Sequence, residues 1–274
     1  MTRQLLFATF VLCAAFSAQA QAQAATDALR QAGELRTLSQ RIPKLYFQQL
    51  LALNDAQAKR ALAESATAVE KHLETLRSVS ATPALARRYA RTVALWAQCR
   101  EFIDHPPTLE GAETLNYLSN DLMISAGRLT FMLESQTVDT GARLVDLSMR
   151  QSMLAQRLAK LYLARRLLGE AGASRVDVHQ ARLEFETSMK EIATAPELTQ
   201  QTRDALELAE GQWIFFDRAI AEGDKGDERL ALHVSTTSER ITESMRDIVA
   251  SYEATRRIAP AHAGQRSKQA VAAR

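Results

Sequence analysis

One segment of the sequence occurs twice, and this repeat constrains the fold more than any other feature. Residues 32–47, AGELRTLSQRIPKLYF, return 116 residues later at 148–163 as SMRQSMLAQRLAKLYL. Six positions of a ten-residue window are identical, and in the first copy these are Leu38, Gln40, Arg41, Lys44, Leu45 and Tyr46. A fixed internal period indicates a repeated structural unit. We therefore interpret the chain as two related halves that each begin with this segment.

The composition and the spacing of apolar residues predict that both halves are helical. The chain has only ten Gly and six Pro, and Ala, Leu, Arg, Gln and Glu are common, as in all-helical proteins. In the first copy Leu35, Leu38, Ile42 and Leu45 recur every three or four residues, which is the pattern of an amphipathic helix. The predicted helices are 27–53, 56–78, 84–103, 109–133, 144–168, 176–194, 199–221 and 228–258.

The expected fold is all-α, with two tandem antiparallel four-helix bundles, because short connections favour antiparallel neighbours. The first bundle spans 25–136 and the second 137–258. The junction at 137–141 leaves two arrangements open. If the chain reverses there, the two opening helices lie parallel and side by side. If it stays helical, one long continuous helix joins the bundles end to end, and we favour this arrangement because the stretch contains no proline.

The N-terminus has the pattern of a secretory signal peptide over residues 1–24. Arg3 precedes an apolar run from Leu5 to Phe16, and small-x-small cleavage sites follow it. The run is short for a transmembrane helix. We therefore expect a cleaved signal, a periplasmic location and no membrane span in the mature chain. At the other end, residues 259–274 are expected to form a disordered tail.

The sequence argues against several classes of protein. Lys and Arg number 34 against 32 Asp and Glu, with no basic block that indicates a nucleic-acid partner. The five His are scattered without an HExxH motif, and no CxxCH haem site is present. We therefore expect no metal, no other cofactor and no enzymatic activity. Loss of Cys13 with the signal leaves Cys99, which we expect to be a buried core residue.

The opening helix of the first half has two unlike faces. At 100° per residue, the bundle-forming leucines lie on one side, and Gly33, Arg36 and Gln40 lie on the opposite side. This mixed face indicates contact with another chain or with the other half, although an exposed arginine is also ordinary. In a partly dry seam, the planar guanidinium of Arg36 would suit a small oxyanion, which accepts paired N–H donors.

These segments resemble a known family. AGELRTLSQRI resembles the P-box that opens the periplasmic domain of nitrate/nitrite sensor kinases and of type IV pilus chemotaxis transducers, the NarX/PilJ-like sensor family. SMRQSMLAQRLAKLYL is similar to the same motif, which implies two tandem copies. The resemblance implies four-helix bundles, usually dimeric, that hold nitrate between two opening helices through the arginine at the Arg36 position.

The resemblance also names candidate ligand-binding residues. The first copy offers Arg36, Gly33 and Gln40 for an anion, and the weaker counterparts in the second copy are Ser152, Gln156 and Arg150. The second copy is weaker because Ser152 replaces the arginine and Met149 replaces the glycine. Arg41 and Arg157 lie nearer the apolar, bundle-forming side of their helices, so we expect them to form salt bridges within the bundle.

Two hypotheses about function follow. The first is a soluble periplasmic sensor or binding module for a small oxyanion such as nitrate or nitrite, without its own signalling domain, since no membrane span or kinase module follows the repeats. The second is a periplasmic helical interaction or scaffold protein with no small ligand. The expected partners are a small anion, a second copy bound through the opening helices, or another periplasmic protein.

Overall fold

The computed structural model describes residues 2–79, 82–135, 141–223 and 226–272, and the side chains between 24 and 255 within these ranges. The described residues form eight α-helices and one short 3-10 helix, with no strands among them, so the all-α prediction is confirmed. In order they are α1 (Thr2–Leu50), α2 (Asp55–Val79), α3 (Pro83–Ile103), α4 (Leu109–Glu134), α5 (Ala142–Leu168), η1 (Gly169–Ala171), α6 (Arg175–Ala193), α7 (Gln200–Glu222) and α8 (Glu228–Ala272).

Local sequence explains where several helices begin. Thr82, Thr108 and Thr199 each accept a backbone hydrogen bond at the start of α3, α4 and α7. Ser174 and Asp177 form a reciprocal capping box at the start of α6. Such side chains satisfy backbone N–H groups that have no partner inside the helix. The chain therefore marks these helix starts independently of tertiary packing.

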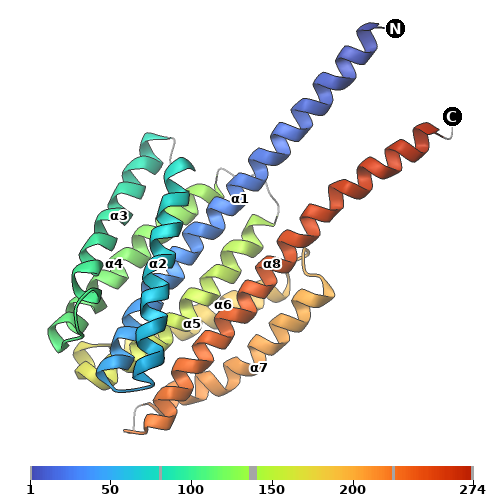
Figure 1. The fold of residues 1–274 in the computed structure, drawn as a ribbon. Helices are drawn as coiled ribbons and strands as arrows, with labels where there is room; N and C mark the ends of the chain where they lie inside the picture. Colours follow the sequence, from blue (N-terminus) through green and yellow to red (C-terminus); the bar gives the residue numbers. More distant parts are fainter. Residues whose placement is uncertain (1, 80–81, 136–140, 224–225, 273–274) are drawn as a thin grey trace.

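The helices α1 and α5 form the centre of the molecule (Figure 1). Every residue from 32 to 48 is buried except Arg41, and every residue from 151 to 164 is buried except Arg157. A helix that packs on one neighbour buries only one stripe, so burial on all sides requires several neighbours. Accordingly α1 packs against α2, α4 and α5, and α5 packs against α1, α6 and α8.

The two central helices run parallel to each other. Residues 30–44 of α1 contact residues 235–253 of α8 in reverse order. Residues 152–156 of α5 contact residues 238–242 of α8, also in reverse order. Because both are antiparallel to α8, α1 and α5 lie side by side in the same direction. Figure 1 shows that the start of α1 and the end of α8 project from the same end of the molecule.

The continuous helix that we favoured at the junction is wrong. α4 ends at Glu134 and α5 begins at Ala142, and α5 lies beside α1 instead of extending α4. Residues 136–140, which carry most of this junction, lie outside the described residues. The physical reason is the second face of α1, which is buried against α5 and would be left uncovered in an end-to-end arrangement. The two halves share one core, and their division into two domains stays a prediction.

The first and last helices are longer than the sequence predicted. α8 continues to Ala272 and so passes the end predicted at Pro260, because a proline removes one helix hydrogen bond without always ending the helix. α1 begins at Thr2 and therefore includes the predicted signal segment, whose side chains before residue 24 are not described. Among the helices that the structure describes, none has a stretch long and apolar enough to cross a membrane.

The tryptophans of α3 and α7 and the Cys99 thiol of α3 pack as expected. Trp96 is buried, and Trp213 stacks on Phe185 with ring centroids 4.0 Å apart. Cys99 is buried beside Trp96 in the core, as the sequence predicts, and burial raises the pKa of its thiol to about 12. These residues therefore contribute to packing.

Candidate functional site

Arg36 lies in the buried seam between α1 and α5. Only 8% of the residue is exposed. Its Nη2 atom donates to the Asp146 carboxylate at 3.0 Å and to the Asp146 backbone carbonyl at 3.2 Å. Its Nε atom is buried and makes no hydrogen bond. The residue is therefore not a solvated surface arginine: it is a buried cation whose charge is matched by a carboxylate of the other half.

Gly33 allows α1 and α5 to approach each other closely. A Cβ atom at this position would lie 2.7 Å from Met149 Cβ and 2.8 Å from Met149 Cγ. Such contacts are shorter than van der Waals packing permits, so a larger residue would push the two helices apart. This packing accounts for the glycine without a ligand.

Gln40 and Gln156 occupy equivalent positions and make equivalent contacts. Gln40 Nε2 donates to the Ser119 carbonyl at 3.0 Å, and Gln156 Nε2 donates to the Ser238 carbonyl at 3.2 Å. Gln40 therefore links α1 to α4, and Gln156 links α5 to α8. In each half the amide joins the first helix, called the opening helix, to the last helix, called the closing helix. The Oε1 atoms of both glutamines are buried and unpartnered, and such acceptors are often satisfied by ordered water.

The remaining candidates do not join Arg36 in one site. The Ser152 hydroxyl donates to the Ser148 carbonyl of its own helix at 3.2 Å. Arg150 reaches the Glu184 carboxylate on α6 at 3.3 Å, on the outer side of α5. The second copy therefore supplies neither a second guanidinium nor a second anion contact to the seam.

The surroundings of Arg36 are more acidic than the sequence indicated. Burial and the negative charge of Asp146 raise the pKa of the Glu134 carboxyl, which places a second acid near the Arg36–Asp146 pair. With its charge already matched, Arg36 attracts a further anion only if Asp146 is displaced or neutralised. Sequence reasoning did not identify Asp146 as the partner of Arg36, because the two residues lie 110 positions apart.

Sequence reasoning also missed a cationic centre at the other end of the seam. Lys44 is completely buried, donates to the Ser238 hydroxyl at 3.0 Å and forms an ion pair with Glu239. Arg41 donates to both oxygens of the same carboxylate at 3.0 Å, which confirms the salt bridge expected for this arginine. Burial alone would raise the pKa of Glu239, but Lys44 and Arg41 outweigh it and lower this pKa to about 2.

Lys160 is the repeat counterpart of Lys44 and is also completely buried. Its Nζ atom donates to the Asn120 side-chain oxygen at 2.8 Å and to the Ser119 hydroxyl at 3.2 Å. Burial, together with the charge of Arg157, lowers the pKa of Lys160 to about 7. Both lysines belong to the six identical repeat positions, and this identity was the signal that would have found them.

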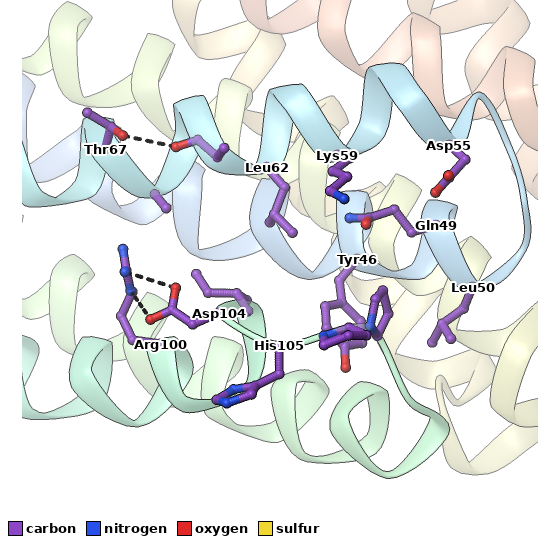
Figure 2. A pocket seen from close by; sticks show the side chains of 15 residues that line it. Tyr46, Gln49, Leu50, Asp55, Lys59, Leu62, Thr67, Arg100, Asp104 and His105 are labelled. Carbon is purple, nitrogen blue, oxygen red and sulfur yellow. Dashed lines mark hydrogen bonds and ion pairs between the residues drawn. The ribbon is translucent and has the colours of Figure 1, made fainter.

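A separate hollow of about 770 Å³ lies between α2 and the end of α3. Figure 2 shows Lys59 of α2 on one side of it and Arg100, Asp104 and His105 on the other. Arg100 is paired with Asp104 at 2.8 Å and with Glu70 at 2.8 Å. None of the predicted site residues lines this hollow.

Comparison with known proteins supports part of the resemblance. Residues 18–120 match the PilJ family, described as the N-terminal domain of type IV pili methyl-accepting chemotaxis transducers. The matched PilJ range runs from α1 into α4 and contains Gly33, Arg36 and Gln40. No curated protein and no solved structure showed a significant match. The PilJ match indicates a sensor-type module of the kind found in chemotaxis transducers.

Proposed function

We propose that this protein is a periplasmic sensor module with two PilJ-like copies, the second over residues 137–258, and that it binds a small oxyanion such as nitrate or nitrite. The observation that supports this proposal is the buried Arg36 guanidinium between two parallel repeat-opening helices. Its Nε atom has no hydrogen-bond partner. A planar oxyanion accepts paired N–H donors from such a group.

Asp146 has a defined part in this proposal. In the described structure its carboxylate occupies the charge-matching position at Arg36. An incoming oxyanion has to replace this carboxylate and then bridges Arg36 Nε and Nη2. The exchange would loosen α5 from α1 at this point, which offers a route from binding to a change in helix packing. Because a native ion pair is lost, we expect millimolar affinity.

The test is thermal unfolding of the purified protein in nitrate, nitrite and chloride at matched ionic strength. Ligand that binds the native state stabilises it by about 2.7 kcal/mol at a concentration of 100 Kd. We expect nitrate to raise Tm, and Asp146→Asn to enlarge the rise because Arg36 loses its internal competitor. The paired variant Arg36→Met with Asp146→Asn removes both charges and should abolish the response.

Equal melting curves in nitrate and chloride for both wild type and Asp146→Asn would rule out the oxyanion ligand. Arg36→Ala alone is a poorer test, because it leaves Asp146 buried and unpaired and so destabilises the fold for another reason. A response that survives in the double variant would mean that the anion binds elsewhere.

A second candidate function, a helical interaction protein without a small ligand, is favoured by one surface. Tyr117, Ile124 and Phe131 are exposed along α4 at seven-residue spacing, and 70% of Tyr117 and of Phe131 is accessible. A straight apolar stripe of this kind suits the seam of a partner helix. The corresponding positions of α8 are also exposed, and they carry Thr236, Glu243 and Ala250.

The charge beside this stripe indicates the chemistry of the partner. A hollow of about 270 Å³ between α3 and α4 is lined by Arg88, Arg91 and Arg128, with Asp121 as its one acidic residue. An acidic amphipathic helix would therefore complement this surface. We expect Ile124→Asp to abolish capture of a partner from periplasmic extract while leaving Tm unchanged. Equal capture by wild type and Ile124→Asp would contradict this assignment.

A further inference from the structure

The two halves can be compared position by position at their central lysines. Lys44 of α1 donates to the Ser238 hydroxyl at 3.0 Å, and Lys160 of α5 donates to the Ser119 hydroxyl at 3.2 Å. Ser119 and Ser238 hold equivalent places on α4 and α8, since their carbonyls accept from the equivalent Gln40 and Gln156. Each opening helix thus inserts a buried lysine against the closing helix of the other half. The surroundings of Lys44 can therefore be compared directly with those of Lys160.

The residue after each serine breaks this symmetry. On α8 it is Glu239, whose carboxylate binds both Lys44 and Arg41. On α4 it is Asn120, which offers Lys160 one neutral amide oxygen. The first centre thus contains two cations and one carboxylate, and the second contains two cations without the carboxylate.

Arg157, the repeat counterpart of Arg41, shows the consequence of this difference. The salt bridge that the sequence predicted for Arg157 is not formed: its Nη1 atom lies 3.8 Å from Met123 Sδ, and its buried Nε atom has no partner. Within the described part of the chain, neither Arg157 nor Lys160 takes part in an ion pair. Asp177 of α6 interacts with Lys160 only by long-range electrostatic attraction, without an ion pair. Its carboxylate already accepts a hydrogen bond from the Ser174 hydroxyl at 2.6 Å.

Lys160 is completely buried, and Arg157 beside it is partly buried with a buried Nε atom. Two such neighbouring cations without a counter-ion are unfavourable, because their desolvation is not offset by an opposite charge. Two changes would remove the uncompensated positive charge: Lys160 loses its proton, or a mobile anion binds and supplies a negative charge. At the other centre the Glu239 carboxylate lies between Lys44 and Arg41. This arrangement indicates that an anion of carboxylate type fits between the matching Lys160 and Arg157.

We propose that a small monovalent oxyanion of carboxylate type binds between Arg157 and Lys160, in the position that the Glu239 carboxylate holds in the other half. Arg157 Nε and Nη1 would donate to the anion from one side and Lys160 Nζ from the other. This site is separate from Arg36, which faces Asp146 along the same seam. A bound anion would keep Lys160 charged, with Ser119 and Asn120 of α4, Arg157 of α5 and Asp177 of α6 as the groups around it.

Formate is the probe, because it is the smallest carboxylate. The measurement is Tm of the full chain at pH 6.5 against sodium formate, with sodium chloride keeping the ionic strength constant. Wild type should show a saturable rise of about 2–4 °C, the size expected for modest stabilisation of a chain of this length. Asn120→Glu supplies the carboxylate covalently, so it should melt higher than the neutral control Asn120→Gln and should not respond to formate.

Three results would overturn the proposal: no formate response in wild type, a full response in Asn120→Glu, or a full response in Lys160→Met. The variant with Arg36→Met and Asp146→Asn separates the two proposed sites. It should keep the formate response, and loss of the response would place the anion at Arg36 instead. If Asn120→Glu does not fold, Lys160→Met and Arg157→Gln provide the same comparison.

Discussion

Replacing the buried Lys160 by methionine is expected to stabilise the protein in acid and neutral solution and to destabilise it in alkali. Burial lowers the pKa of Lys160 from 10.5 to about 7. Between these values the unfolded chain binds one proton more than the folded chain, so wild-type stability rises with pH across this window. At about 1.36 kcal/mol per pKa unit, the charged lysine destabilises the native state by about 5 kcal/mol below pH 7.

The methionine variant removes this penalty and also loses two contacts. The hydrogen bonds from Lys160 to Ser119 and Asn120 contribute about 1 kcal/mol each. The net gain at pH 6 is therefore about 3 kcal/mol, and in alkali above pH 10.5 the variant should be less stable by about 2 kcal/mol. The two stability curves should cross near pH 9, where the remaining penalty, about 2 kcal/mol, equals the lost hydrogen bonds.

Urea unfolding in amine buffers with sodium chloride from pH 6 to 10.5, without added formate or nitrate, measures this crossing. Lys44→Met is the matched control, because Lys44 is equally buried but paired with Glu239. Its removal leaves the Glu239 carboxylate with Arg41 alone and should destabilise the protein at pH 6. A Lys160→Met variant that is less stable than wild type at pH 6, or a stability difference that does not change with pH, would refute the reasoning.

Three further predictions use other parts of the structure. Glu239→Gln should destabilise the protein by about 2 kcal/mol in urea unfolding at pH 7, a value reduced for the partly exposed carboxylate. Because the pKa of Glu239 is lowered to about 2, its contribution is lost as pH falls from about 4.5 to about 2, and the variant should show a flatter acid-unfolding curve. Gly33→Ala should lower stability by about 1–3 kcal/mol in urea unfolding through overpacking against Cβ and Cγ of Met149; a Gly33→Ala variant as stable as wild type would contradict the close approach of α1 and α5. Cys99, whose pKa is raised to about 12, should resist thiol titration at pH 8 until urea unfolds the chain, and rapid labelling of the native protein would contradict its burial.

The sequence by itself determined the local structure and the internal repeat. Helix periodicity and capping depend on residues a few positions apart, so the apolar spacing of Leu35, Leu38 and Ile42 and the cap at Thr82 predicted helices without tertiary information. The core position of Cys99 followed from the same spacing. The mixed face of Gly33, Arg36 and Gln40 correctly indicated a second contact surface, and the PilJ match lies over this segment.

The tertiary structure alone decided which surface meets that face and which charges are paired. Whether α5 extends α4 or lies beside α1 depends on burying the second face of α1, which requires contacts between residues over 100 positions apart. The same holds for Arg36, whose counter-ion is Asp146, and for Lys44 and Lys160, which are identical in the repeat but differ in charge pairing. Ionisation of a buried group depends on its neighbours in space, and sequence periodicity does not specify those neighbours.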